Sequence, residues 1–451
     1  MRPGAAALAC LLLACAPAPP PDAPDIVLIV VDTLRSDHLP SYGYRRNTAP
    51  ALSALADEGV LFERVIAPSS WTKTSMASMM TGLNPDGHAV RGVEDALSDS
   101  LPTLATSLAH AGYATIGINT NPWLEPGFGF ARGFDVYETH VFSPAGEVNR
   151  IALARVEELR RRPFLLYVHY MDVHAPYRFR EASLKDRPLR LPGRGAVPDE
   201  LLEHAYRKEG LQGAGVHERV IRLYDAGIRA VDSAIADLLR ELGSQGALDN
   251  AIVAVTSDHG EAFREHGSAE HGRNLYPEVY EIPLILRWPG RIPAGARIPA
   301  QVRGVDLAPT LLHLAGVPIP PGLDGSSLMP FDVKAMEPRI AIAAVGLNDY
   351  IPHLDYVAVV SPDRLYIRER RSGSVEFYDL ERDPDARHDL GAAHPEVEDY
   401  ARLPGPGLQG TRDRERTPKA RLDEPTRERL RALGYLDEPG EPGEQGDAGR
   451  R

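Results

Sequence analysis

The chain has 451 residues, 43% of them hydrophobic, and a formal net charge of −13. That length suffices for one large domain or two, and the acidic balance argues against a protein that binds nucleic acid through its overall charge. The two cysteines, Cys10 and Cys15, both lie within the first fifteen residues. The rest of the chain can therefore form no disulfide bond among its own residues and offers no cysteine as nucleophile or metal ligand.

The N-terminus is predicted to be a targeting segment. Arg2 precedes an apolar run over residues 5–14, which is too short to span a bilayer. The motif Leu-Leu-Ala-Cys at residues 12–15 resembles the lipobox of bacterial lipoproteins, in which the cysteine becomes the lipidated first residue. An ordinary cleaved signal peptide is the alternative. Residues 16–24 are rich in Pro and Ala and predict an extended tether. We therefore expect an exported lipoprotein of the bacterial cell envelope that faces the periplasm.

The first predicted strand, Asp25–Val31, is a continuous apolar run of the kind that is buried on both faces of a parallel sheet. Asp32 follows it directly and so lies at the carboxyl end of the strand, where α/β proteins place their ligands. Four further buried strands are predicted over residues 114–118, 164–170, 251–255 and 283–287. They alternate with amphipathic helices predicted over residues 47–58, 101–111, 151–162 and 218–242. This alternation predicts an α/β layered fold with a mainly parallel sheet.

Residues 69–82 are predicted to form a loop that turns into a short helix. The methionines of this stretch recur at helical spacing and are expected to face a core. Thr72 then lies at the start of the helix, where free backbone N–H groups and the helix dipole favour an anion. A hydroxyl in that place can attack phosphorus or sulfur if its pKa is lowered. The alternative is that Thr72 only caps the helix.

A second acid follows the predicted strand over residues 251–255, because Asp258 and His259 come shortly after its end. Together with Asp32 and Thr72 they would supply two carboxylates, an imidazole and a hydroxyl to one divalent metal ion. The nitrogen ligand favours Zn²⁺ or Mn²⁺, while Ca²⁺, which prefers oxygen ligands, is the less favoured possibility. Such an ion would hold Thr72 as an alkoxide and polarise the substrate oxygen. Either Asp alone could instead cap a loop or a helix.

The pattern changes from residue 338, where short strands are predicted over residues 340–344, 356–360 and 364–367. These strands predict a smaller C-terminal α+β subdomain that is partly antiparallel. Beyond about residue 403, Pro, Gly and charged residues dominate and predict a largely disordered tail, apart from a helical piece near residues 426–433. The predicted organisation is a signal segment, a tether, a catalytic domain, a subdomain and a tail, over residues 1–15, 16–24, 25–337, 338–403 and 404–451.

Several motifs resemble the sulfatase branch of the alkaline phosphatase superfamily. They include that branch's first metal motif, its nucleophile loop, the helix before its second metal motif, the second metal motif itself and the start of its C-terminal segment. In this chain the similar stretches are residues 31–38, 71–82, 224–232, 256–261 and 376–380. The resemblance extends over about residues 25–395, in the family's order. It implies an alkaline-phosphatase-like fold and a metal-dependent ester hydrolase.

The chain also departs from the family pattern. Ordinary sulfatases carry Cys or Ser within Cys-x-Pro-Ser-Arg and oxidise it to formylglycine, whereas residues 72–76 here read Thr-Lys-Thr-Ser-Met. Thr cannot give that aldehyde, and the arginine is missing. Thr33 replaces the second of two paired acids, and residues 119–122 lack the Lys and His of the family's Gly-Lys-Trp-His motif. A Thr nucleophile with Asp and His ligands is similar to the superfamily's phosphodiesterases and to its lipoteichoic acid and phosphoethanolamine transferases.

The resemblance implies further catalytic residues. Asn121 is expected to donate to a non-bridging substrate oxygen, as an Asn does in related phosphodiesterases. His174 matches a family histidine that contacts the substrate or protonates the leaving group, and His271 is a similar candidate. Lys73 is expected to neutralise the transferring group. Alternatively, Asp172 could join the two histidines in binding a second metal ion.

The sequence therefore predicts a hydrolase of sulfate or phosphate and phosphonate esters that uses Thr72 as nucleophile. Phosphorus esters are favoured because an ester of Thr must be released by attack of water, and a sulfated Thr would be a poor intermediate. The expected substrate is a small anionic ester, or an ester carried by a glycan or a lipid. The alternatives are a transferase that passes a phospho-headgroup through Thr72 and a surface lipoprotein without catalytic activity. The sequence carries no indication of an oligomeric state.

Overall fold

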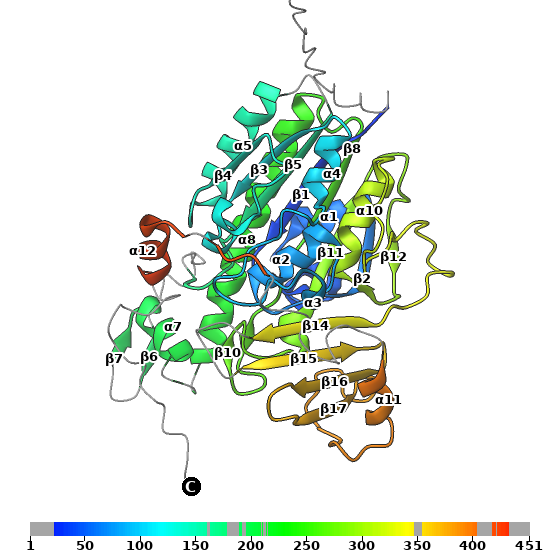
Figure 1. Ribbon diagram of the computed structural model, residues 1–451. Helices are drawn as coiled ribbons and strands as arrows, with labels where there is room; N and C mark the ends of the chain where they lie inside the picture. Colours follow the sequence, from blue (N-terminus) through cyan, green and yellow to red (C-terminus); the bar gives the residue numbers. More distant parts are fainter. Residues whose placement is uncertain are drawn as a thin grey trace, which may run out of the picture.

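The computed structural model describes residues 22–159, 163–177, 189–191, 195–208, 210, 213, 215–346, 354–403, 417–420 and 422–432 (Figure 1). The predicted signal segment and most of the predicted tether lie outside these residues. Among the helices of the described ranges, none has both the length and the apolar character needed to cross a membrane.

A nine-stranded sheet forms the centre of the molecule, with the order β12-β2-β11-β8-β1-β5-β3-β4 and with β13 paired to β2. Its middle strands are parallel, since β1 lies between β8 and β5, and β3 and β4 continue in the same direction. Their bounds are Asp25–Val31 for β1, Ala114–Asn119 for β3, Val136–Thr139 for β4, Phe164–Tyr170 for β5 and Ala251–Thr256 for β8. The predicted α/β fold with a mainly parallel sheet is confirmed.

One strand of the sheet runs against the others. β11 (Glu281–Arg287) is antiparallel to both of its neighbours, β8 and β2 (Val60–Ile66). The remaining strands at this edge are β12 (Ala296–Ile298) and β13 (Val302–Arg303). Outside the sheet, two short hairpins are formed by β6 (Leu189–Leu191) with β7 (Gly195–Val197) and by β9 (Ala262–Phe263) with β10 (Ala269–Glu270).

Helices cover both faces of the sheet because every strand in its middle is apolar on both sides. Along β1, alternate residues belong to two separate hydrophobic cores. One core is closed by α1 (Pro50–Asp57), α5 (Ala145–Leu159) and α8 (Val216–Ser244). The other is closed by α2 (Thr72–Thr81), α4 (Leu104–His110) and α10 (Leu307–Leu314). The other helices of the main body are α3 (Pro85–His88), α7 (Asp199–Lys208), α9 (Pro277–Tyr280), and the 3-10 turns η1 (Ser36–His38), η2 (Pro40–Tyr42), η3 (Pro122–Leu124), η4 (Pro126–Phe128) and η5 (Gly304–Asp306).

The C-terminal part contains a separate antiparallel sheet, as the change of pattern after residue 338 predicts. Its four strands are β14 (Ala341–Gly346), β15 (Asp355–Val360), β16 (Arg364–Glu369) and β17 (Val375–Asp379), with α11 (Val397–Arg402) packed beside them. Buried ion pairs connect this sheet to the main body. Arg91 contacts both Asp86 and Asp355, and Arg370 contacts Asp86 at 2.8 Å.

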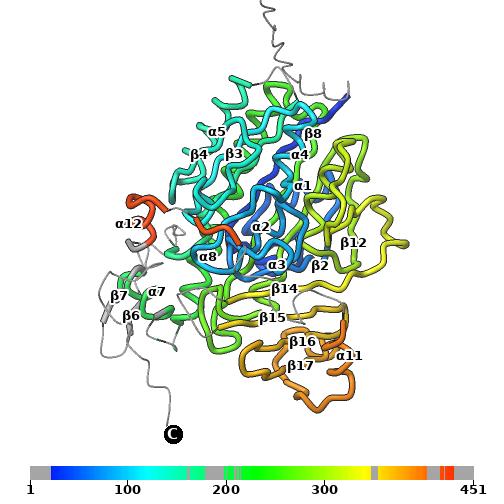
Figure 2. Tube along the Cα trace, in the orientation of Figure 1, coloured from blue at the N-terminus to red at the C-terminus, as the bar shows by residue number. Residues whose placement is uncertain are grey.

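Residues 417–420 and 422–432 form a segment that we call the C-terminal strap. Figure 2 shows this end of the chain, in red, crossing back over the main body. Lys419 forms an antiparallel bridge with Asp95, and α12 (Glu424–Ala432) packs against η3. Leu430 of α12 is completely buried in the main core. A helical piece near residues 426–433 was predicted as the exception to a largely disordered tail, and α12 lies at that place.

Candidate functional site

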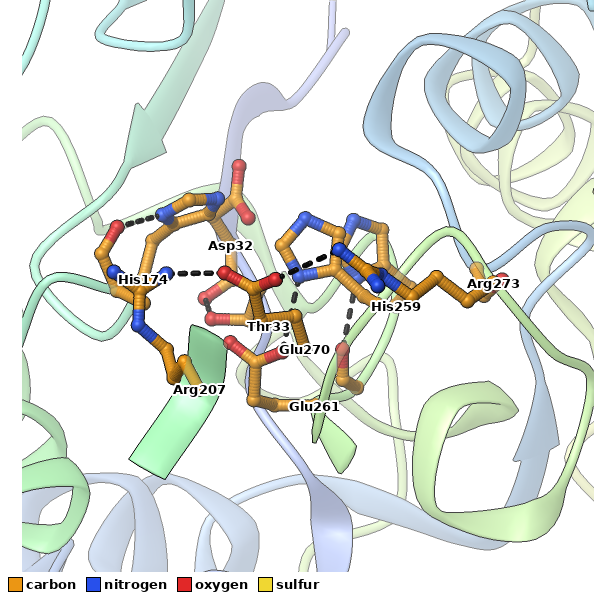
Figure 3. Close-up of polar contacts among 12 residues, drawn as sticks. Asp32, Thr33, His174, Arg207, His259, Glu261, Glu270 and Arg273 are labelled. Atoms are coloured by element: carbon orange, nitrogen blue, oxygen red, sulfur yellow. Dashed lines mark hydrogen bonds and ion pairs between the residues drawn. The ribbon is translucent and has the colours of Figure 1, made fainter. Parts of the chain in front are cut away.

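The predicted metal ligands meet at the carboxyl edge of the main sheet. Asp32 follows β1, and Asp258 and His259 follow β8, the parallel neighbour of β1. All three side chains are fully buried, and one ligand atom from each lies within 4.8 Å of the other two. Figure 3 shows Asp32 and His259, with His174 and Glu261, arranged around one centre beyond the end of β1.

In each of the two carboxylates one oxygen accepts the hydrogen bonds, and Oδ2 of Asp258 lies 3.4 Å from Nε2 of His259. Oδ2 of Asp32 accepts a hydrogen bond from Nδ2 of Asn121 at 2.7 Å and lies 3.1 Å from Nε2 of His169. Oδ1 of Asp258 accepts hydrogen bonds from the backbone N–H of Thr33, at 3.2 Å, and from that of His259, at 2.9 Å. Among the residues that the structure describes, neither Oδ1 of Asp32 nor Oδ2 of Asp258 has a hydrogen-bond partner. Buried carboxylate oxygens without partners are costly, so this donor set fits a cation.

The electrostatics of the site also favour positive charge. Burial alone would raise the pKa of Asp32, but the hydrogen bond from His169 and the nearby histidines hold that pKa well below its usual value. Burial likewise lowers the pKa of His259, yet the carboxylates of Asp258 and Asp32 outweigh burial and raise it above the usual value. Asp32 is therefore ionised at neutral pH, as a metal ligand must be.

Thr72 opens α2 and turns its hydroxyl toward this site. Trp71, the residue before it, occupies the N-cap position, and no side chain caps the helix. Oγ1 of Thr72 lies 3.1 Å from Nε2 of His259 and 3.3 Å from Nδ2 of Asn121. Nδ1 of His259 faces the carbonyl of Gly260 at 2.9 Å. A carbonyl only accepts, so Nδ1 carries a proton and Nε2 is left to accept from Thr72 or to bind a metal. The capping alternative for Thr72 is therefore not what the structure shows.

The position of α2 relative to the acids is fixed by packing. All ten of its residues are buried, and Oγ of Ser75 donates to the backbone carbonyl of Asp258 at 2.6 Å. This hydrogen bond links the first turn of α2 to the loop that carries two of the candidate ligands. The free N–H groups at the start of the helix and its dipole therefore lie beside Thr72, where they favour an anionic group.

The structure also places three of the predicted catalytic side chains at the site. Asn121 contacts both Asp32 and Thr72 through Nδ2, while its Oδ1 accepts the N–H of Trp123 at 2.8 Å. The ring centre of His271 lies 4.4 Å from that of His259 and 5.0 Å from that of His174. Burial and the neighbouring His259 lower the pKa of His271 to about 3.

Lys73 does not have the surroundings that its predicted role requires. Its side chain is completely buried, and Nζ donates to the carbonyl of Val93 at 2.6 Å. Nζ also lies 3.8 Å from the ring centre of Phe128, with two tryptophan rings nearby. Burial lowers the pKa of Lys73 well below its usual value. These contacts favour a structural role for Lys73, and its predicted part in charge neutralisation stays a prediction.

The predicted second metal set does not form among the described residues. Asp172 uses Oδ1 to accept the backbone N–H of Ala145 at 3.1 Å, at the start of α5. Within the described part of the chain, Asp32, Asp258 and His259 are the one group of three His, Cys, Asp or Glu side chains whose ligand atoms converge. His174 and His271 are thus left as candidates for proton transfer.

Two residues that contact the predicted site residues, Glu261 and His169, were not predicted from the sequence. Glu261 is completely buried, and its Oε1 lies 3.1 Å from Nδ1 of His271. Burial raises the pKa of Glu261 to about 7. His169 contacts Asp32 and is itself 2.9 Å from the hydroxyl of Tyr167. Both residues lie at or just beyond the carboxyl ends of the strands next to β1, which is the signal that could have identified them.

A charged group from more distant segments lies next to the site. Figure 3 shows Arg207, from α7, and Arg273 on either side of Glu270. Both arginines form ion pairs with Glu270, and that of Arg273 measures 3.1 Å. Arg207 also pairs with Glu203 of the same helix at 2.6 Å. The segment of the chain between β5 and α8 therefore contributes to the surroundings of the site.

Comparison with known proteins identifies a family. A family model described as Sulfatase matches residues 24–317. An N-acetylglucosamine-6-O-sulfatase of Bacteroides thetaiotaomicron is 41% identical over 129 residues, which cover 28% of this chain and 23% of that protein. An arylsulfatase of Clostridium perfringens is 24% identical over 440 residues, which cover 80% of this chain and 89% of that protein.

Solved structures share the fold. The crystal structure of a phosphonate monoester hydrolase of Agrobacterium radiobacter has a TM-score of 0.65 and 19% sequence identity. The superposition covers 84% of this chain and 94% of that one. The layered arrangement of the main sheet and its helices is therefore that of alkaline-phosphatase-like hydrolases.

Proposed function

Because the chain belongs to the sulfatase family, whose members are ester hydrolases, we propose that it hydrolyses an anionic sulfate or phosphorus ester through Thr72, with phosphorus esters as the better substrates. One observation carries the proposal. The buried hydroxyl of Thr72 lies 3.1 Å from Nε2 of His259, at the start of a helix and next to a converging pair of carboxylates. A nucleophile, a cation site and an anion-binding helix end thus coincide.

Asp32, Asp258 and His259 would hold a divalent cation, with Oγ1 of Thr72 as a further ligand. The imidazole nitrogen in this set favours Zn²⁺ or Mn²⁺ over Ca²⁺. When bound, the cation supplies positive charge that favours ionised Thr72 and attracts the ester oxygens.

The chain's own groups then account for the reaction. Nδ2 of Asn121 and the N–H groups at the start of α2 are placed to donate to non-bridging oxygens of the ester. Oγ1 of Thr72 attacks phosphorus or sulfur, and the bond to the leaving alcohol breaks while a histidine supplies the proton. Water then attacks the Thr72 ester, the bond to Oγ1 breaks, and Thr72 is restored. The second step is feasible for a phosphoryl group, whereas a sulfated Thr would be released slowly.

A substrate comparison tests this proposal. The purified protein, supplied with Zn²⁺, Mn²⁺ or Ca²⁺, is assayed with 4-nitrophenyl sulfate, a phosphate monoester, a phosphodiester and a phosphonate monoester. We expect the best phosphorus ester to exceed the sulfate in kcat/KM. Faster turnover of the sulfate than of every phosphorus ester would overturn the preference, and full activity of Thr72→Ala would overturn the mechanism.

We also propose that the protein is anchored to the membrane through lipid on Cys15. The support is the lipobox-like motif followed by the Pro-rich residues 16–24. Cys15→Ser should release the protein from the membrane fraction. A wild-type protein that is entirely soluble and begins at another residue would contradict the anchor.

A further inference from the structure

A small pocket lies beside the candidate site, and the proposed reaction leaves it without an occupant. Its volume is about 40 Å³, which holds a group of a few heavy atoms. We call it the Phe142 pocket. It is formed by the segment before α5 and the segment at the end of β5, and its lining residues are Phe142, Ser143, Pro144, Met171, Asp172, His174 and Pro176.

His174 is a wall that the Phe142 pocket shares with the candidate site. The ring centre of His174 lies 6.4 Å from that of Phe142 and 5.0 Å from that of His271. The backbone N–H of Phe142 donates to the carbonyl of Thr120 at 3.1 Å, and Thr120 directly precedes Asn121. An ester bound at the nucleophile can therefore place the far end of its alcohol in this pocket.

Phe142 holds its ring at the pocket with a backbone conformation that bulky residues rarely adopt. Its φ is 56°, in the left-handed region. The N–H of Ser143 donates to the carbonyl of His140 at 3.0 Å, which closes the turn around Phe142. Strained residues of this kind persist where the surrounding structure fixes them, and they are concentrated at ligand-binding sites. The aromatic ring is therefore a fixed part of the pocket.

The charge of the lining indicates the chemistry of the occupant. Asp172 brings a carboxylate to the pocket, and within the described part of the chain no Lys or Arg lines it. Oδ1 of Asp172 accepts the backbone N–H of Ala145 at 3.1 Å, which fixes the carboxylate at the start of α5. A carboxylate and an aromatic ring both attract an organic cation, and the methionine and proline walls suit the carbon atoms that such a cation carries.

We propose that the Phe142 pocket binds the ammonium end of a small amino alcohol and that an ester of this alcohol is the substrate. The assignment rests on the proposed function and narrows its substrate class. Such a molecule carries an anion and a cation a few bonds apart. The start of α2 favours the anion, and the neighbouring pocket with its carboxylate favours the cation.

Binding of two esters of the same shape tests the preference for charge. The (2-trimethylammonio)ethyl and 3,3-dimethylbutyl esters of methylphosphonate differ at one atom, which is a positively charged nitrogen in the first and a carbon in the second. Their Kd values are measured by calorimetry on Thr72→Ala supplied with Mn²⁺, because a variant without the nucleophile leaves both esters intact. We expect the charged ester to bind about tenfold more tightly, within the range that a cation over an aromatic ring contributes. Equal affinities, tighter binding of the neutral ester, or no binding of either would overturn the proposal.

Two substitutions in the Thr72→Ala background locate the effect in the pocket. Asp172→Asn removes the charge but keeps an oxygen that can accept the N–H of Ala145, and Phe142→Leu removes the aromatic face but keeps an apolar side chain. Each should bring the two Kd values within about threefold of one another. Glu147→Gln is the matched control and should leave the difference unchanged, because Glu147 is an exposed acid in the first turn of α5 that does not line the pocket.

The proposed function and the Phe142 pocket fail in different ways. Absence of ester turnover by the wild-type protein, or an active Thr72→Ala, would overturn the proposed function. With wild type active and Thr72→Ala inactive, equal affinities would overturn the pocket alone. An undiminished difference in both Asp172→Asn and Phe142→Leu would do the same, because the cation would then bind elsewhere. If Asp172→Asn does not fold, Phe142→Leu decides the outcome.

Discussion

Asp32 and Asp258 present one carboxylate oxygen each to the same buried place, and the other oxygen of each is fixed by hydrogen bonds from the protein. The two acids come from parallel neighbouring strands, so their approach is set by the sheet. Two carboxylates held in this way repel one another until a cation lies between them. Part of the binding free energy of that cation must therefore appear as stability of the fold.

Metal removal is predicted to destabilise the protein. Treatment with a chelator should lower Tm, and Zn²⁺ or Mn²⁺ at a hundredfold excess over Kd should restore about 2.7 kcal/mol of stability. Asp258→Ala should lose both bound metal and turnover, as measured by elemental analysis and by ester hydrolysis. Asp37→Asn is the control, because Asp37 pairs with Arg35 and lies outside the converging set. Full metal content in Asp258→Ala would exclude it as a ligand.

Replacing the nucleophile is predicted to abolish turnover while the fold survives. Thr72→Ala should lower kcat by a factor of about 10⁴ or more, since losses of this order follow removal of a covalent nucleophile. Mass spectrometry of acid-quenched wild type should find the phosphoryl group on Thr72. Thr72→Ser, which keeps a hydroxyl, should retain measurable activity. An adduct on any other residue would speak against the assignment.

Lys73 is predicted to be dispensable for chemistry despite its place next to Thr72. Nζ of Lys73 donates a hydrogen bond to the carbonyl of Val93 and lies over the ring of Phe128. Lys73→Met should therefore keep kcat/KM within about tenfold of wild type. Loss of a donor to the developing charge would instead cost about 10²–10³ in kcat. A loss of that size at unchanged Tm would support the catalytic role that the sequence predicts for Lys73.

The acid stability of the protein is predicted to depend on Asp225 of α8. Its carboxylate contacts Nδ1 of His38 at 2.8 Å, Tyr44 at 2.9 Å and Arg46 at 2.6 Å. Burial raises the pKa of Asp225, but the hydrogen bond and charge of His38, with those of Arg46 and Tyr44, outweigh it and lower the pKa below its usual value. The resulting stability is present above the unfolded pKa of about 3.9 and is lost as the pH falls through the folded value.

Asp225→Asn should therefore cost about 3–5 kcal/mol at pH 7, as breaking a buried pair does, and the variant should lose less stability than wild type below pH ~4. Urea unfolding at both pH values measures this difference. Asp237→Asn on the same helix serves as control, because Asp237 and its partner Arg240 are exposed. Equal acid sensitivity of wild type and Asp225→Asn would contradict the prediction.

The sequence predicts the middle of the fold well because its strands are uninterrupted apolar runs. The bounds of β1 and β5 agree with the predicted ones for this reason. β2 was missed, since Glu63 and Arg64 interrupt its apolar pattern where the strand faces partly outward. α5 begins six residues earlier than predicted, at Ala145, because its first N–H is bound by Asp172 from beyond β5. Such a distant partner leaves no local pattern.

The candidate site, like the fold, could be predicted only in part. Asp32, Asp258 and His259 could be predicted, because residues within a few positions of the end of a buried strand lie at the edge of the sheet. The direction of Lys73 and the pairing of Glu261 with His271 depend on side-chain contacts between segments far apart in the sequence. Neither periodicity nor spacing records these contacts.

The C-terminal strap supports the turn that begins with Asn121. Thr426 donates to Glu125 at 2.6 Å, and Arg429 contacts the same carboxylate at 3.0 Å, directly behind the turn that begins with Asn121. A chain that is made or exported from its N-terminus forms these contacts late, because the strap contains the last of the described residues. Removal of residues 417–432 would take this support from behind Asn121 while every candidate catalytic side chain stayed in the chain.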